Sequence, residues 1–164
     1  MKKSLIRTIF FIISIIFIST SAYAEFELIV DGDIIDFGFM DINQTKELHD
    51  EGFYHNQVAC ISDNNNTWYL KVHLAEPFSS GMYFIPYENF EWQVSSVING
   101  DGIICNRDIF KGFLDTPALV YTSGPNDTNG GAVKIRFEYR ISIPRGQAPG
   151  NYRGIMRYTM IELL

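Results

Sequence analysis

Cysteine and histidine are scarce in this sequence, and their scarcity removes several kinds of site. The chain has two cysteines and three histidines among 164 residues. Neither Cys60 nor Cys105 has a second cysteine or a histidine at the spacing of a zinc ligand pair. The run His49-Asp50-Glu51, with His55 nearby, lies in a polar stretch without a clear strand or helix, which favours a solvated loop. We therefore expect no metal and no cofactor.

Basic residues are also few. Thirteen lysines and arginines stand against nineteen aspartates and glutamates, which gives a formal net charge of −6. Three of the thirteen lie within the first 24 residues, which contain no acidic residue, so a chain without that segment would have a net charge of −9. Because such a protein repels phosphate backbones, we expect no nucleic-acid partner.

The motifs of common catalytic and nucleotide sites are missing. Ser79-Ser80-Gly81 lacks a flanking glycine of the Gly-x-Ser-x-Gly turn, and no glycine-rich loop carries the lysine of a phosphate-binding loop. Asp31-Gly32-Asp33 and Asn99-Gly100-Asp101-Gly102 lack the acidic spacing of a calcium loop and predict turns. We expect no enzyme. A carboxylate pair for glycoside hydrolysis is defined by distance in space and stays open at this point.

One long apolar run is present, and it lies at the N-terminus. Lys2, Lys3 and Arg7 precede the apolar block Ile9–Ile18, and small residues lead to Ala22-Tyr23-Ala24. This order predicts a signal peptide over residues 1–24, cleaved after Ala24, rather than a membrane anchor. We expect an exported protein of the periplasm, cell surface or extracellular space, with no membrane span after cleavage.

Export bears on the two cysteines. In an oxidising compartment an even number of cysteines in one small domain favours a disulfide. We therefore predict a bond between Cys60 and Cys105. Two buried free thiols are the alternative.

Alternation of apolar and polar residues dominates the rest of the chain, and helical periodicity is nearly absent. The longest alternating segment is Ala132–Ile143, and Trp68–Ala75 and Phe90–Val94 behave similarly. The segment Tyr152–Leu163 is partly apolar on both faces, which predicts a strand in the centre of a sheet or one covered by a partner. A turn at residues 62–66 predicts a hairpin between Gln57–Ile61 and the Trp68 strand. Weaker strands are expected at Phe26–Val30, Ile34–Met40, Met82–Ile85 and Ala118–Thr122. These features predict one all-β domain over residues 25–164, an antiparallel two-sheet immunoglobulin-like sandwich of about seven to nine strands, with a barrel as the alternative.

Four segments carry a family resemblance. They are Asp36-Phe37-Gly38, Val58-Ala59-Cys60, Trp68-Tyr69-Leu70, and Pro149-Gly150-Asn151-Tyr152 before a long final strand. Together they resemble the pilin-like sandwiches of the spore coat U group and the archaic chaperone–usher pilins. The resemblance implies a non-catalytic subunit of a surface fibre or coat, whose partners are other copies, related subunits, a periplasmic chaperone and an outer-membrane usher. The chain departs from ordinary chaperone–usher pilins because its last four residues lack their penultimate tyrosine.

Aromatic residues make up 15% of the chain and supply candidate contact residues. Trp68, Phe90 and Trp92 share the phase of the inward residues, so we expect them in the core. Tyr83 and Tyr87 flank Pro86 in a predicted loop, and we predict that they are exposed and could contact a ligand. A secreted carbohydrate- or peptide-binding module is therefore the alternative to a surface subunit.

The first predicted strand is a candidate for pairing between subunits. Phe26, Leu28 and Val30 alternate with other residues just before the turn Asp31-Gly32-Asp33. A short terminal strand can pair within its own sheet or be donated to the open edge of a neighbour. Both arrangements remain open from the sequence. The function we expect is a structural or adhesive subunit of a bacterial cell-surface fibre or coat.

Overall fold

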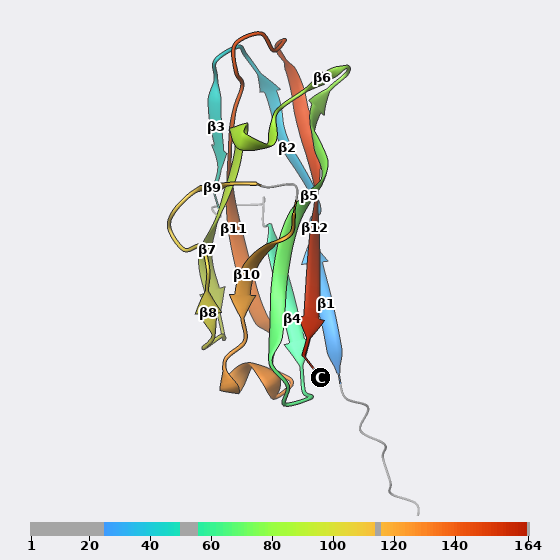
Figure 1. Cartoon of the computed structure of the whole chain (residues 1–164), viewed down its shortest axis with the longest axis vertical. Coiled ribbons are helices and arrows are strands. Elements are labelled where there is room, and N and C mark those ends of the chain that lie inside the picture. The colour runs from blue at the N-terminus through green and yellow to red at the C-terminus, as the bar shows by residue number, and fades with distance from the viewer. Residues whose placement is uncertain (1–24, 50–55, 114–115, 164) are drawn as a thin grey trace, which may run out of the picture.

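A computed structural model describes residues 25–49, 56–113 and 116–163 (Figure 1). Nearly all of the regular structure in these ranges is β-strand. The strands of four residues or more are β1 (Phe26–Asp31), β2 (Ile34–Met40), β3 (Thr45–Leu48), β4 (Gln57–Ser62), β5 (Trp68–Ser80), β7 (Phe90–Ile98), β10 (Ala118–Thr122), β11 (Val133–Ser142) and β12 (Gly150–Glu162). The shorter elements are strands β6 (Tyr83–Phe84), β8 (Ile103–Ile104) and β9 (Lys111–Gly112), and the 3-10 helices η1 (Tyr87–Asn89) and η2 (Pro125–Thr128).

Some predictions concern residues outside these ranges. The predicted signal peptide and its cleavage site lie outside the described residues. The same holds for Asp50, Glu51 and His55 of the polar run. Within the part of the chain that is described, no helix is long and apolar enough to cross a membrane.

The strands form two antiparallel sheets that lie face to face in an elongated sandwich (Figure 1). Sheet A has the order β1-β4-β11-β7-β9, and β3 pairs with β11 beyond the end of β4. Sheet B has the order β2-β12-β5-β10-β8, and β6 pairs with the end of β5. The predicted antiparallel two-sheet sandwich is confirmed. The described residues contain twelve strands instead of seven to nine, because β3 and the two-residue strands β8 and β9 have no counterpart among the predicted strands.

The core follows from the alternation read in the sequence. Along β11, and along β5 from Trp68 to Leu74, every second side chain points between the sheets and is buried. Trp68, Phe90 and Trp92 are at most 2% exposed, so their prediction as core residues is confirmed. Phe90 stacks on Phe113 at 5.0 Å between ring centroids and so extends the core toward the β9 edge.

The predicted hairpin between the Gln57 strand and the Trp68 strand is wrong. β4 belongs to sheet A and β5 to sheet B, so the turn between them joins the two sheets. Val58 and Trp68 are both fully buried and face the same core from opposite sheets. Alternation identifies which side chains point inward, but it does not identify the strand that pairs alongside.

Polar groups also join the two sheets. The hydroxyl groups of Tyr139 on β11 and Tyr158 on β12 lie 2.6 Å apart inside the core. Burial raises the pKa of both hydroxyls, so they stay protonated at alkaline pH values at which an exposed tyrosine would ionise. At the edge of the sandwich, the Lys46 ammonium of β3 donates to the backbone carbonyls of Phe37 and Phe39 on β2.

A buried aspartate closes the end of the sandwich near η2. Asp127 is 1% exposed and its carboxylate accepts hydrogen bonds from the Tyr121 hydroxyl at 2.6 Å and the Gly124 amide at 2.7 Å. It also accepts from the Asp101 amide at 3.1 Å, which joins the turn after β7 to η2. The backbone carbonyl of Asp127 in turn accepts from the Trp68 indole at 3.2 Å. Asp127 therefore joins β10, the turn after β7 and η2 through its carboxylate, and contacts Trp68 of the core through its backbone carbonyl.

The predicted disulfide between Cys60 and Cys105 is also wrong, because both are free thiols in the structure. Cys60 lies on β4 in sheet A and its side chain is fully buried between the sheets. Cys105 follows β8 at the edge of sheet B and is exposed. An exposed side chain at that edge does not meet a thiol buried between the sheets.

We predict that the two thiols differ sharply in reactivity. Burial raises the pKa of Cys60 to about 12, and the negative charge of Asp127 adds to this shift. Since the thiolate is the reactive form, a maleimide reagent at neutral pH should label one thiol in the native protein and two in denaturant. Cys105→Ser should abolish labelling of the native protein. Labelling of two thiols without denaturant would contradict the buried position of Cys60.

Candidate functional site

The N-terminal strand β1 is an edge strand with little buried surface. It pairs antiparallel with β4 over six residues, from Phe26–Ser62 to Asp31–Gln57. Of its apolar side chains, only Leu28 is partly buried against the core, whereas Phe26, Ile29 and Val30 are 37–47% exposed. In the structure, β1 thus pairs with β4 of its own chain. Of the candidate donor residues Phe26, Leu28 and Val30, only Leu28 therefore packs against the core.

The chain passes from sheet A to sheet B immediately after β1. Gly32 has φ +87°, a left-handed conformation that favours glycine, and the chain then enters β2. The register between β2 and β12 ends at Ile34–Ile155, and the Met156 amide donates to the Asp33 carbonyl. Beyond this point no described strand pairs with that edge of β12. A groove of about 470 Å³ adjoins the unpaired edge, lined by Val30, Gly32, Asp33, Ala75 and residues 155–158.

Aromatic and aliphatic side chains are exposed at the end of the sandwich that lies away from the C-terminus. Tyr83 and Tyr87 are 44% and 37% exposed, so their predicted exposure is confirmed. Four apolar side chains that were not selected from the sequence are more exposed than these two tyrosines, namely Met82, Phe84, Phe39 and Ile42. Figure 1 places β6 and the end of β2 at the end of the sandwich away from the C-terminus.

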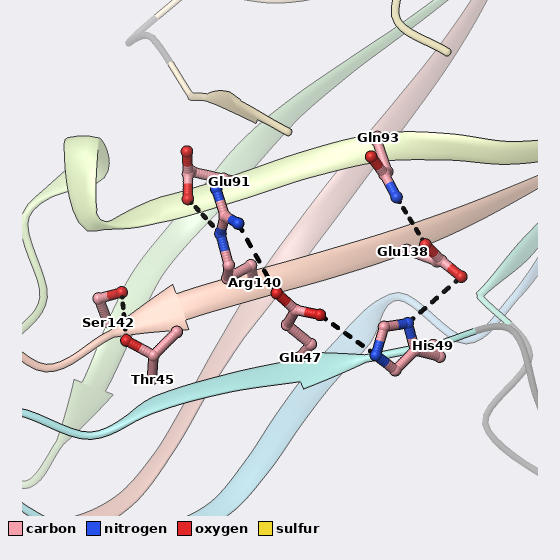
Figure 2. A network of polar contacts seen from close by, with 8 residues as sticks. All are labelled: Thr45, Glu47, His49, Glu91, Gln93, Glu138, Arg140 and Ser142. Atoms are coloured by element: carbon pink, nitrogen blue, oxygen red, sulfur yellow. Dashed lines mark hydrogen bonds and ion pairs between the residues drawn. The ribbon is translucent and has the colours of Figure 1, made fainter. Parts of the chain in front are cut away.

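A row of polar side chains covers the outer face of sheet A (Figure 2). Arg140 on β11 donates to Glu91 on β7 at 2.6 Å and lies 3.6 Å from Glu47 on β3. The hydrogen bond that Arg140 donates to Glu91 is the main cause that raises the pKa of Arg140. His49 lies between Glu47 at 3.2 Å and Glu138 at 3.5 Å.

This polar row acts as a brace between three strands. Gln93 donates to Glu138 at 2.6 Å, so each of the three carboxylates already has a donor from a neighbouring strand (Figure 2). Among the described residues no three histidine, cysteine, aspartate or glutamate side chains could together hold a metal ion. His49 was predicted in a solvated loop. It is exposed and follows β3 directly, where its contacts fix the end of that strand to β11.

A second groove lies on the outer face of sheet B. It has a volume of about 490 Å³ and is lined by Tyr69, Lys71, Pro117, Leu119, Ile161 and Leu163. β12 lies between β2 and β5, as its two apolar faces predicted, but Ile161 and Leu163 on its outer face are exposed. This face is therefore apolar without being covered by another part of the described chain.

The chain matches no family model, no curated protein and no solved structure.

Proposed function

We propose that this chain is a structural or adhesive subunit of a bacterial cell-surface fibre or coat, and that copies join by exchanging strand β1. The observation that supports the proposal is the position of β1. It is terminal in the predicted exported chain, lies at a sheet edge, and is held mainly by its ladder to β4. Other copies, or closely related subunits, are the partners that the proposal requires.

Exchange of β1 costs little at the level of contacts. A neighbour's β1 would form the same six residue pairs with β4 that the chain's own β1 forms. Only one apolar side chain, Leu28, has to leave and re-enter the core region. Because each copy donates one strand and accepts another, the contact is head to tail, and it generates a filament unless the rotation between copies closes a ring.

The register of β1 provides a direct test. Leu28 lies opposite Cys60 in the ladder. The Asp63 amide donates to the Glu25 carbonyl, which makes Glu25 and Asp63 a hydrogen-bonded pair. Hydrogen-bonded and non-hydrogen-bonded pairs alternate along an antiparallel ladder, so Leu28 and Cys60 form a non-hydrogen-bonded pair. Such pairs have the Cα separation that a disulfide needs, about 4.5 Å.

We predict that Leu28→Cys, in a Cys105→Ser background, forms a disulfide with Cys60 after oxidation. At high protein concentration, exchange of β1 should place the new cysteine beside Cys60 of another copy. Non-reducing electrophoresis should then show a ladder of covalently linked oligomers that collapses to the monomer with reductant.

The matched control adds Cys60→Ala to the same variant, which should remove the ladder. An internal bond in every molecule, with no linked oligomers at any concentration, would show that β1 pairs only within its own chain. That result would reject assembly by exchange of β1 and leave a stand-alone surface module.

A further inference from the structure

The end of the sandwich formed by β2, β5 and β6 carries a cluster of exposed apolar side chains, which we call the apolar tip. It consists of Phe39, Ile42, Met82, Tyr83 and Phe84. Met82 is 82% exposed, Phe39 60% and Phe84 57%, values that are high for large apolar residues. Isolated exposed apolar residues are ordinary, but a cluster of them at one end of a molecule marks an interaction site.

The apolar tip is held in place by its backbone. Gly81, with φ +61°, allows the tight turn that projects Met82, and β6 then pairs with β5 through Ser80–Tyr83 and Ser79–Phe84. The Gln147 side chain donates to the Phe84 carbonyl at 2.9 Å, which ties the neighbouring loop to the hairpin. Across β12, Gly150 lies opposite Met40, beside Phe39. The side chains therefore project from a braced hairpin and a neighbouring strand end.

Few charged residues lie at this end, although the Lys46 ammonium lies beside Phe39, where it donates to the Phe37 and Phe39 carbonyls. Residues 41–44, 81–84 and 144–149 contain one acidic residue, Asp41, and one basic residue, Arg145. The Asp41 carboxylate already accepts from the Ile42 amide at 2.8 Å. The other eighteen of the nineteen acidic residues lie outside these loops. The opposite end carries the polar turn Asp63-Asn64-Asn65-Asn66.

We propose that the apolar tip inserts into the interfacial region of a lipid membrane. Small ligands and peptides are held in concave sites lined by converging polar groups, whereas the apolar tip protrudes and offers mostly apolar atoms. Lipid acyl chains are fluid, so they can surround a protruding apolar surface and remove it from water. Tyrosine prefers the membrane–water boundary, where its ring is buried and its hydroxyl stays hydrated, and Tyr83 lies beside the two most apolar side chains of the hairpin.

The geometry also leaves the rest of the molecule free. β1 begins near the C-terminus, at the end of the sandwich opposite the apolar tip (Figure 1). The apolar tip can therefore insert whether or not copies of the chain exchange β1. The inference goes beyond the proposed function, and each can fail without the other.

Co-sedimentation of the exported protein with phosphatidylcholine vesicles tests the proposal. We expect the native protein to bind, and Met82→Ser combined with Phe84→Ser to weaken binding by about tenfold or more, because most of the inserted apolar area is lost. The control combines Ile103→Ser and Ile109→Ser, which are 69% and 65% exposed but lie outside the apolar tip. Circular dichroism should show that both variants are folded, and the control should bind like the native protein.

A fluorescent label reports on insertion itself. Met82→Cys in a Cys105→Ser background can be labelled selectively, since Cys60 is buried. An environment-sensitive dye at position 82 should shift to the blue when vesicles are added, whereas the same dye at Ile103→Cys should not. The proposal is overturned if the native protein does not bind these vesicles, or if the Ile103 and Ile109 control weakens binding equally. It is also overturned if binding occurs only with anionic vesicles, or if a glycan array gives a signal that the Met82 and Phe84 variant loses.

Discussion

Replacing Asp127 with alanine should lower the free energy of unfolding by about 4 kcal/mol, because a buried carboxylate with three donors is removed. The Tyr121 hydroxyl and the amides of Gly124 and Asp101 would lose their acceptor. Burial, and after it the hydrogen bond to Asp127, raises the pKa of Tyr121, which is consistent with a closed site. Domains of this size have total stabilities of about 5–15 kcal/mol, so the change would remove a large part of the total.

Urea denaturation of the variants measures this effect. Asp127→Asn keeps one acceptor oxygen and the shape of the side chain, so we expect a smaller loss of about 2 kcal/mol. Asp101→Ala is the matched control, because its carboxylate binds Asn126 from an exposed position in the same pair of turns. It should cost about 1 kcal/mol or less. Equal losses for Asp101→Ala and Asp127→Ala would show that burial of Asp127 does not govern its contribution.

The importance of Asp127 could not be predicted from the sequence. It lies in a run of turn-forming residues, and nothing local distinguishes it from Asp101 or Asp63. Its burial depends on Tyr121 and Trp68, which approach it only when sheet B has formed. Alternation, by contrast, is a local property. It therefore identified the inward side chains of β5, β7 and β11 correctly.

The errors in the predicted connections have the same origin. The turn after β4 has the composition of a hairpin loop, yet it joins the two sheets, because strand pairing is decided by the global fold. The disulfide prediction relied on an even cysteine count, which says nothing about where side chains point. β3 went unrecognised because its residues, Thr45–Leu48, are mostly polar and it is held partly by side-chain contacts of Glu47 and Lys46.

In the candidate site, too, local sequence patterns identified some residues and missed others whose exposure depends on the whole fold. Tyr83 and Tyr87 were found because aromatic residues beside a proline predict an exposed loop. The more exposed Met82 and Phe84 were not selected, because Met82–Ile85 was predicted only as a weak strand. Only the position of β6 at the end of β5 shows that this strand has little of the core to cover.

Deleting residues 25–31 should abolish assembly and lower the melting temperature by about 10 °C. The estimate assumes a loss on the order of 3 kcal/mol, from the ladder to β4 and the partial burial of Leu28. For a domain of this size 1 kcal/mol corresponds to a shift of about 3–5 °C. Because the other large core residues are kept, the truncated protein should remain folded at room temperature. Size-exclusion chromatography should find it monomeric at concentrations at which the intact protein forms oligomers.

Adding β1 back as a peptide distinguishes loss of the β1–β4 pairing from non-specific destabilisation of the truncated protein. A synthetic peptide of residues 25–31 should restore most of the melting temperature, since a ligand at about 100 times its dissociation constant stabilises by about 2.7 kcal/mol. The same peptide with Leu28→Asp should have no effect, because Leu28 is its one side chain packed against the core. If the truncated protein still forms oligomers, β1 is not the strand that joins copies. If it is unfolded and the peptide does not rescue it, β1 is an integral part of the sandwich and cannot be exchanged.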